Sequence, residues 1–380
     1  MHPSQKPKAT GRSLGLWIVM SLATFVSASV IRAQADEAAE ELIAKLDLRE
    51  SEVAVRDLPG WKQPKRIVVL VDNDARLDWL KKTVTDVELI SMRQDGPASD
   101  MTGVQGLVGS CTPNIVSSAM ELHWIHISSA GVERCVSRPE IQGGNYLITN
   151  MQRVNSEPIA EHVIAMMLTL TRSLPYYRSL QDEERWKPLP FGDTRMREVQ
   201  GKTILIVGLG GIGTEVARRA DALGMHVIAT RNSSRDGPDF VDQVGLADEV
   251  LNFAAQADVV VNAAPLTPET TDLFDAEFFS VMRPQSYFFN VGRGKSVVTD
   301  DLVAALSDGT LAGAGLDVTE PEPLPPGHSL WQAPNVIITP HVATRTDGGL
   351  ERYWLVVREN LRRYVAGDKI YSIVDVKRGY

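Results

Sequence analysis

The sequence predicts an α/β protein with two doubly wound parallel sheets. From residue 65 to residue 365, short apolar runs rich in β-branched residues alternate with segments of helical periodicity, a pattern typical of parallel strands joined by helices. One run, Thr203–Val207, is followed by the glycine pattern G-x-G-x-x-G, and charged residues follow three later runs. Ligands of such sheets bind beyond the carboxyl ends of the strands, so these positions are the candidates for a site.

The composition is that of a globular chain long enough for two domains. Its 380 residues are 43% hydrophobic and 23% charged, which allows a sizeable core. The net charge of −9 and the absence of a basic stripe argue against nucleic acid as a partner. The sequence has only two cysteines and no cluster of metal ligands, and we therefore expect no metal.

Residues 1–35 have the features of a secretory signal peptide. This segment contains basic but no acidic residues and includes an uncharged run, Leu14–Val30. Ala33-Gln34-Ala35 then has the A-x-A pattern of a signal-peptide cleavage site. An uncleaved membrane anchor and an organelle transit peptide are the alternatives, but the run is short for a span. We expect an exported, periplasmic protein, or a cytoplasmic one if the leader is not functional. Residues 36–64 are interpreted as an extension with a surface helix and a linker.

Five apolar runs predict the strands of the first domain. They are followed by helical segments but by no glycine fingerprint, so this domain is not expected to bind a dinucleotide. The long apolar helix Glu157–Arg172 is predicted to carry the chain onward, and Leu350–Val365 to return it, which gives domains 65–165 with 342–380, and 166–341. The predicted strands are Lys65–Asp72, Val87–Ser91, Gly106–Gly109, Leu122–Ser128 and Asn145–Asn150.

Cys111 and Cys135 each lie just beyond one of these strands. If the two strands are neighbours in the sheet, the cysteines can form a disulfide, as suits an oxidising compartment. The alternative is a pair of free thiols. Between them lies Ser128-Ser129-Ala130-Gly131, whose small residues leave backbone N–H groups open as an anion nest, or which is an ordinary turn between a strand and a helix.

The second domain begins at Gly201 with a dinucleotide fingerprint. Gly208 allows a tight turn, Gly210 lets a pyrophosphate approach the main chain, and Gly213 lets the following helix pack on the strand. The N–H groups and the positive end of the helix dipole then face the phosphates. The strand, turn, helix and next strand, His226–Ala229, complete the context that the motif requires.

The residues after the second strand predict which dinucleotide binds. Arg231 stands where an NAD site has an acid for the ribose hydroxyl, with Asn232, Ser233 and Ser234 beside it. A guanidinium cannot accept a hydrogen bond but pairs well with a phosphate. The sequence therefore favours NADP(H), and the alternative is a solvated arginine beside an NAD site.

Residues with side chains suited to catalysis follow three of the four further strands predicted in this domain. The runs that predict these four strands are Ala257–Asn262, Tyr287–Val291, Gly313–Val318 and Val336–Thr339. Arg293, between two glycines, can hold a carboxylate in two-pronged fashion. Glu322 lies between two prolines, and His341 ends the last strand. A nearby carboxylate stabilises an imidazolium and makes it a usable acid. The alternatives are an interface arginine, a solvated acidic loop and a structural histidine.

This run of motifs resembles the D-isomer-specific 2-hydroxyacid dehydrogenase family. The likeness covers roughly Lys65 to Asp375, and several motifs in one order are highly specific. The matching segments are Asn155–Met167, Gly208–Gly213, Asn262–Thr271, Asn290–Gly294, Gly315–Pro323 and Thr339–His341.

The resemblance implies a flavodoxin-like substrate domain and a Rossmann NAD(P)-binding domain with the active site in the cleft, in a homodimer. A hydride passes between the nicotinamide and C2 of a small 2-keto or 2-hydroxy acid. Arg293 binds the substrate carboxylate and keto oxygen, and His341, paired with Glu322, transfers the hydroxyl proton. Ala130 and Gly131 match the loop that binds the carboxylate. The positions that match cofactor contacts are Gly208, Gly210, Gly211, Ile212, Gly213, Pro265, Thr267, Val291, Gly292, Arg293, His341 and Asp317, the last at the nicotinamide carboxamide.

Two features depart from the family pattern. Arg231 favours NADP(H), as in many glyoxylate and hydroxypyruvate reductases, with NAD as the alternative, and the leader is unusual. Two other functions compete with a 2-keto acid reductase. One is a non-catalytic nucleotide-binding scaffold, as in the transcriptional corepressor branch, and the other is a formate-dehydrogenase-like enzyme. The latter pairs its histidine with glutamine, and Glu322 speaks against it.

Overall fold

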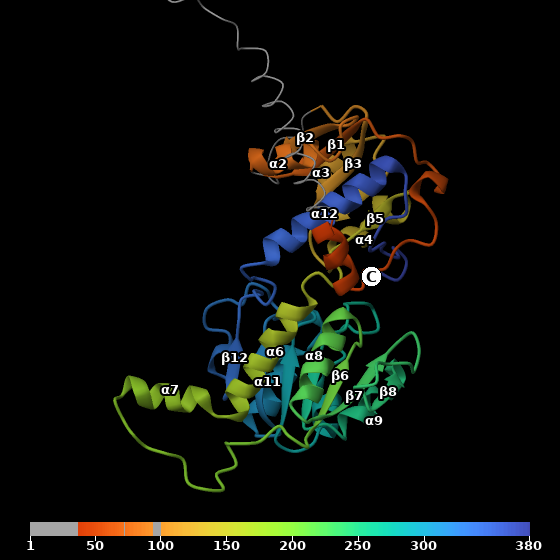
Figure 1. Ribbon diagram of the computed structural model, residues 1–380. Coiled ribbons are helices and arrows are strands. Elements are labelled where there is room, and N and C mark those ends of the chain that lie inside the picture. The colour runs from red at the N-terminus through yellow and green to blue at the C-terminus, as the bar shows by residue number, and fades with distance from the viewer. Residues whose placement is uncertain (1–36, 72, 94–99) are drawn as a thin grey trace, which may run out of the picture.

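The computed structural model describes residues 37–71, 73–93 and 100–380 as two α/β domains (Figure 1). Each is built around a parallel sheet, which confirms the predicted fold class. The predicted leader, residues 1–35, lies outside the described residues. Among the helices that are described, none combines the length and the apolar character needed to cross a membrane.

The first domain contains a parallel sheet with the strand order β2-β1-β3-β4-β5 among the described residues. This is the flavodoxin-like order, and each strand overlaps a predicted one. Short helices follow β1, β3 and β4, and the long C-terminal helix α12 returns from the second domain to pack here. The elements are β1 (Arg66–Leu70), α2 (Asp74–Lys81), β2 (Glu88–Met92), β3 (Val104–Gly109), α3 (Pro113–Ser118), β4 (Trp124–Ile127), α4 (Glu133–Val136), α5 (Pro139–Gln142), β5 (Leu147–Thr149) and α12 (Gly349–Ala366).

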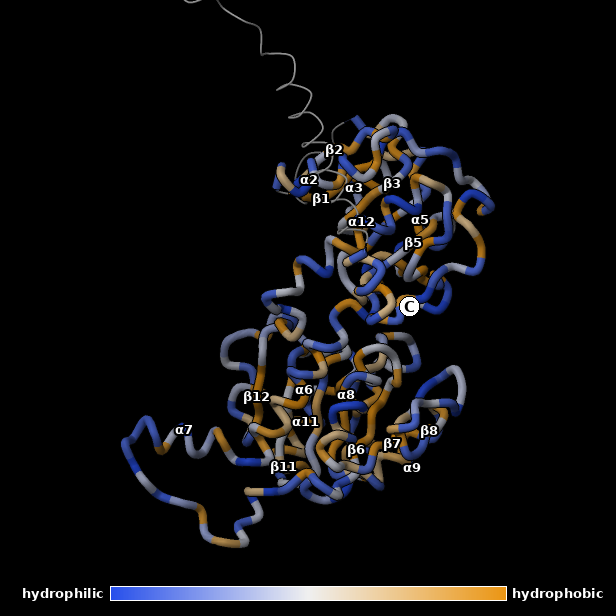
Figure 2. The backbone as a smooth tube through the Cα atoms, in the orientation of Figure 1, coloured by the Kyte–Doolittle hydropathy of each residue, from blue (hydrophilic) through white to orange (hydrophobic). Residues whose placement is uncertain are grey.

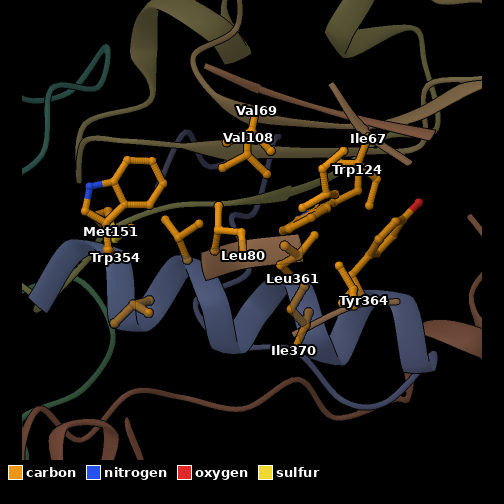
Figure 3. Close-up of a cluster of buried hydrophobic side chains, with 14 of the residues drawn as sticks. Ile67, Val69, Leu80, Val108, Trp124, Met151, Trp354, Leu361, Tyr364 and Ile370 are labelled. Carbon is orange, nitrogen blue, oxygen red and sulfur yellow. The ribbon is translucent and has the colours of Figure 1, made fainter. Parts of the chain in front are cut away.

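Helix α12 completes the core of the first domain (Figure 3). The rings of Trp124 on β4 and Tyr364 on α12 stack with their centroids 4.6 Å apart. Leu361 of the same helix is fully buried beside them. Burial of side chains of this size stabilises a domain by roughly 1.5–3 kcal/mol each, so the first domain depends on a helix from the far end of the chain.

The segment before β1 also belongs to this core. This segment contains a helix at residues 37–45 and the 3-10 helix η1 (Val55–Asp57). It places four buried side chains against the cluster that includes α12: Ile43, Leu46, Leu48 and Val55. The backbone of Glu50 pairs with that of Tyr371. Residues 37–64 are therefore a packed part of the domain and more than the extension and linker that we expected, because their spaced apolar residues cover its helical side.

The second domain has a parallel sheet of strand order β12-β11-β10-β9-β6-β7-β8 in the part of the chain that the structure describes. The winding reverses between β6 and β9, which is where such sheets bind ligands. The edge strand β8 has no clear signal in the sequence because only one of its residues is buried. The elements are β6 (Thr203–Val207), α8 (Gly211–Ala222), β7 (His226–Arg231), β8 (Gln243–Leu246), α9 (Val250–Ala254), β9 (Val259–Asn262), α10 (Ala276–Val281), β10 (Ser286–Asn290), α11 (Thr299–Ser307), β11 (Leu311–Leu316) and β12 (Val336–Ile338).

Helix α6 (Ser156–Thr171) packs beside α8 on the second domain (Figure 1). Its buried residues Ile159, Val163 and Met167 share one core with β6. The chain therefore crosses between the domains at the start of α6, earlier than the boundary predicted at residue 165. The reason is that the apolar face of this helix is complementary to the second sheet along its whole length.

After α6, residues 174–200 form an arm that leaves the second domain (Figure 1). The arm starts with α7 (Leu174–Asp182), and its base is closed where the N–H of Arg197 donates to the carbonyl of Thr171 at 2.8 Å. The hydropathy view shows that the apolar residues are concentrated along the strands of both domains, whereas the arm carries isolated apolar positions (Figure 2).

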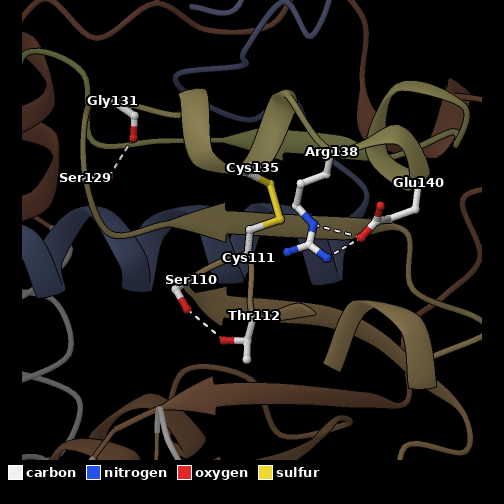
Figure 4. The surroundings of a disulfide bond; sticks show 8 residues. All are labelled: Ser110, Cys111, Thr112, Ser129, Gly131, Cys135, Arg138 and Glu140. Atoms are coloured by element: carbon white, nitrogen blue, oxygen red, sulfur yellow. Dashed lines mark hydrogen bonds and ion pairs between the residues drawn. A yellow bond between two sulfur atoms is a disulfide. The ribbon is translucent and has the colours of Figure 1, made fainter. Parts of the chain in front are cut away.

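Cys111 and Cys135 form a disulfide, with their Cα atoms 5.5 Å apart (Figure 4). Cys111 follows β3 and Cys135 lies in α4, and β3 and β4 are neighbours in the sheet. Of the two alternatives open from the sequence, the structure shows the bonded one. The bond closes a loop that contains β4 and the turn at residues 128–131.

Candidate functional site

The three residues predicted to be catalytic follow three adjacent strands. Arg293 comes after β10, Glu322 after β11 and His341 after β12, and these strands are paired in that order. Because the strands are parallel, their carboxyl ends meet at one edge of the sheet. The structure therefore brings the predicted residues to the edge that faces the first domain, where Arg293 contacts Glu133.

His341 and Glu322 form a hydrogen-bonded pair. The Nδ1 atom of His341 lies 2.8 Å from Oε1 of Glu322, and the two side chains are 44% and 38% exposed. An ionised carboxylate only accepts hydrogen bonds, so Nδ1 carries the hydrogen. Within the described residues Nε2 has no protein partner, and this leaves it available to a ligand.

Asp317 holds the chain segment that carries His341. Its carboxylate is 4% exposed and accepts from the hydroxyl of Thr339 at 2.6 Å. It also accepts from the backbone N–H groups of Val342 at 2.9 Å and Ala343 at 3.1 Å. The N–H of His341 donates to the carbonyl of Asp317 at 2.8 Å. Asp317, the position that matches a nicotinamide contact of the family, thus has a carboxylate that is hydrogen-bonded to groups of the protein itself.

Two other histidines, His162 and His126, have hydrogen-bond partners within the protein. Nε2 of His162, in α6, lies 2.9 Å from the hydroxyl oxygen of Thr339. This contact adds His162 to the hydrogen-bond network around Asp317. The sequence signal for it is a polar residue within an otherwise apolar helix. His126 of β4 is fully buried, and burial lowers the pKa of its imidazole to about 3. It therefore remains neutral at physiological pH.

Arg293 connects the two domains through Glu133, a residue that the sequence analysis did not single out. Its Nε lies 2.8 Å from Oε1 of Glu133, its Nη2 lies 3.4 Å from Oε2, and its Nη1 donates to the carbonyl of Gly292 at 2.7 Å. Partial burial by itself would raise the pKa of the Glu133 carboxyl, but the hydrogen bonds and charge of Arg293 outweigh this and lower the pKa. Glu133 is therefore ionised at neutral pH.

The turn after β4 lies against this arginine. A Cβ atom at Gly131 would stand 1.4 Å from Nη2 of Arg293. The carbonyl of Ala130 accepts from the side chain of Asn150 and that of Gly131 from the hydroxyl of Ser129, both at 2.7 Å. The N–H groups of Ala130 and Gly131 donate to no other atom of the described chain. Free N–H groups beside a guanidinium make a site for an anion.

The glycine-rich turn has the geometry that a dinucleotide needs. Gly208 has a φ of +96°, and a Cβ there would stand 2.7 Å from the backbone of Ala264. A Cβ at Gly213 would stand 2.1 Å from the carbonyl of Gly208, so this glycine allows the close packing of α8. A Cβ at Gly210 would meet no described atom within 4 Å. The turn therefore fits a bound pyrophosphate, with Gly211 and Ile212 opening the helix behind it.

Two buried asparagines shape the neighbouring loops. Nδ2 of Asn262, at the end of β9, donates to Oδ1 of Asn290, at the end of β10, at 3.0 Å. Asn262 also accepts from the N–H of Ala264, and Asn290 binds the N–H of Gly292 and the carbonyl of Arg293. This network fixes the two loops that carry the remaining predicted cofactor contacts, which are Pro265, Thr267, Val291 and Gly292.

At the end of β7, Arg231 is half-buried and Asn232 and Ser233 are exposed. Nη1 of Arg231 donates to the carbonyl of Asp236 at 3.1 Å, and across the described ranges the side chain forms no ion pair. The nearby Arg235, in contrast, is paired with Glu249 at 2.7 Å. Arg231 therefore keeps its charge available for a phosphate.

The described part of the chain contains no group of three or more metal-ligating side chains that could hold a metal ion.

Replacement of Asp317 by asparagine tests the network that holds His341. The NH₂ group of the asparagine would face another donor, either a hydroxyl or a backbone N–H, in a buried site. We therefore expect a loss of about 1–3 kcal/mol in the free energy of unfolding. Thermal denaturation measures this loss. Exchange of the exposed Glu320 for glutamine is the control, and equal melting temperatures for D317N and the wild type would contradict the role given to Asp317.

Comparisons with known proteins agree with this geometry. Residues 164–343 match the family model described as D-isomer specific 2-hydroxyacid dehydrogenase, NAD binding domain. The chain is 32% identical over 252 residues to a glycerate dehydrogenase of Methylorubrum extorquens, which covers 65% of this chain and 77% of that protein.

Two solved structures share the whole two-domain arrangement. A D-isomer specific 2-hydroxyacid dehydrogenase from Xanthobacter autotrophicus Py2, in complex with NADPH and MES, has a TM-score of 0.72 and 28% identity, and covers 84% of this chain and 100% of its own. An NADPH-dependent glyoxylate/hydroxypyruvate reductase from Sinorhizobium meliloti, in complex with NADP and sulfate, has a TM-score of 0.71 and 27% identity, and covers 83% and 100%. The fold, the strand-end residues and these relatives together place the chain in the D-isomer-specific 2-hydroxyacid dehydrogenase family.

Proposed function

We propose that this protein is a reductase of small 2-keto acids, of the glyoxylate/hydroxypyruvate type, that forms D-2-hydroxy acids with NADPH. The observation that carries the proposal is the meeting of the His341–Glu322 pair, Arg293 and the turn at Ala130 and Gly131 at one edge of the sheets. The relatives that bear reductase and dehydrogenase names support the substrate class.

The substrate carboxylate would bind to the free N–H groups of Ala130 and Gly131 and to the guanidinium beside them. Two-pronged, charge-assisted hydrogen bonds are strong and directional. The same guanidinium would polarise the keto oxygen, since donors fixed in advance at the position of developing charge lower the barrier to reaction.

His341 would supply the proton. The hydrogen on Nδ1 is held by Glu322 at 2.8 Å, so the proton transferred to the keto oxygen is the one on Nε2. The hydrogen bond to the carboxylate orients the ring. Asp317 has a positioning role in this scheme, because it holds the backbone on both sides of His341.

The cofactor would lie along the Gly208–Gly213 turn, with its pyrophosphate at Gly210 and the start of α8. Arg231 and Ser233 would bind the 2′-phosphate, and the loops at Pro265, Thr267, Val291 and Gly292 would form the rest of the site. When bound, the nicotinamide would supply the hydride for C2 of the substrate. The NADPH and NADP in the two solved relatives support this choice over NAD.

The proposed activity is tested by following NADPH oxidation with glyoxylate, hydroxypyruvate, pyruvate and bulkier 2-keto acids. We expect turnover with at least one of them, and a fall of about 10²- to 10⁴-fold in kcat for His341→Ala, because the general acid is lost. The dissociation constant of NADPH should be unchanged in that variant. A nucleotide-binding scaffold would bind NADPH without turnover, and an undiminished rate in H341A would remove His341 from the mechanism.

Arg231→Ala is expected to weaken NADPH binding by roughly 10- to 100-fold, since one charge-assisted interaction with a phosphate is lost. NADH binding should change little, because NADH has no 2′-phosphate. Fluorescence titration with both cofactors measures the difference. Arg235→Ala is the matched control, as that side chain is paired with Glu249, and equal losses for the two cofactors in R231A would contradict the assignment.

We propose further that the protein is a homodimer and that the arm, residues 174–200, contacts the second subunit. Trp186 and Phe191 are fully exposed on it and Leu174 is half exposed, which is the surface that an interface would cover. Sedimentation should give a dimer for the wild type and a monomer after joint replacement of Trp186 and Phe191 by serine. A monomeric wild type, or a double variant that remains dimeric, would refute this.

A further inference from the structure

Glu133 has no part in the chemistry described above, yet it forms an ion pair with Arg293 from the other domain. We propose that Glu133 is a positioning residue that aims the guanidinium of Arg293 at the substrate carboxylate, and that the Cys111–Cys135 disulfide holds Glu133 in place. This inference rests on the proposed function, because it concerns the orientation of the proposed substrate anchor.

The geometry of the ion pair leaves the end of the guanidinium free. Glu133 engages the side formed by Nε and Nη2, and Gly292 takes one hydrogen of Nη1. A guanidinium has five N–H groups, so one remains on each terminal nitrogen. These two can bind a carboxylate or a carboxylate and its keto oxygen. Glu133 therefore fixes the plane of the fork without occupying its outer end.

The surroundings of the pair indicate a fixed orientation. The side chains of Arg293 and Glu133 are only 27% and 33% exposed, so solvent screens the attraction between their charges less than it would on an open surface. Nη2 lies against Gly131, next to the unused N–H groups of the turn. Any rotation of the guanidinium would turn its donors away from an anion bound at those N–H groups. Small misplacements of this kind can reduce catalysis about 100-fold.

Glu133 stands on a support that is too short to be stable alone. Helix α4 has four residues, and isolated helices of this length do not form in water. Two features hold it: the buried side chains of Val132 and Val136 in the core, and the bond from Cys135 to Cys111 at the end of β3. Figure 4 shows the disulfide next to the turn that contains Ser129 and Gly131.

A competing interpretation is that Glu133 imitates the substrate and blocks Arg293. A blocking carboxylate would lie at the outer end of the fork and would also occupy the N–H groups of Ala130 and Gly131. Glu133 does neither. The two interpretations predict opposite changes in substrate affinity when the carboxylate is removed, so a single variant separates them.

The first test is Glu133→Gln, with Glu133→Asp as the conservative variant and Glu140→Gln as the matched control. Glu140 lies on the next helix, exposed, and pairs with Arg138 of its own domain. For E133Q we expect the KM of the best 2-keto acid to rise by about 10-fold or more, with the NADPH dissociation constant unchanged. The dissociation constant of oxamate, a 2-keto acid analogue that is not reduced, should rise with it. E133D should fall between, and E140Q should match the wild type.

The second test is a double-mutant cycle with Cys111→Ala/Cys135→Ala. If the disulfide acts through Glu133, its removal raises the KM, but adding E133Q causes little further change. Dithiothreitol should raise the KM of the wild type and leave that of the cysteine variant unchanged. Melting temperatures and NADPH titrations confirm that each variant is folded. Additive effects of the two changes would limit the disulfide to general stability and overturn that half of the proposal.

An E133Q variant with an unchanged KM and unchanged oxamate binding would overturn the positioning role, and a lower KM would favour the blocking interpretation instead. These outcomes differ from failure of the proposed function. In that case the wild type itself would reduce no 2-keto acid and would not bind oxamate.

Discussion

Parallel pairing of the strands is the constraint on which this structure depends. Every connection must return the chain to the end of the sheet at which the previous strand began. All carboxyl ends of the strands in a sheet therefore lie along one edge. Residues far apart in the sequence, such as Arg293 and His341, are therefore brought to the same edge of the sheet by the pairing of the strands that precede them. Chemistry at that edge requires only that the loops hold their side chains in fixed orientations.

Buried polar groups provide that fixation. Asp317 binds two backbone N–H groups beyond His341, and Asn262 and Asn290 bind the loops around Arg293. Each would be costly to bury without partners, and each has hydrogen-bond partners within the protein. The same reasoning applies across the domain boundary, where two charges face each other under partial burial. The geometry of the site is thus set largely by residues that need not touch a ligand.

Local patterns in the sequence were sufficient to predict the strands other than β8, the glycine turn and the strand-end residues. An apolar β-branched run, a G-x-G-x-x-G turn and a charge after a strand are each contained within a few residues. Glu133 and Arg293 are 160 positions apart, and no spacing rule connects an acid in one domain with an arginine in the other. The roles of Asp317 and Asn290, the packing of residues 37–64 and the path of the arm depend on the assembled fold for the same reason.

The place of α12 in the first domain has a consequence for how the protein is made. During synthesis, β1–β5 leave the ribosome long before their last packing partner, and the second domain is completed in between. Trp124 acquires its stacking partner Tyr364 only when translation is almost finished. A nascent chain therefore carries a finished nucleotide-binding unit attached to an unfinished one whose apolar face is open, and for that interval it requires protection from association with other chains.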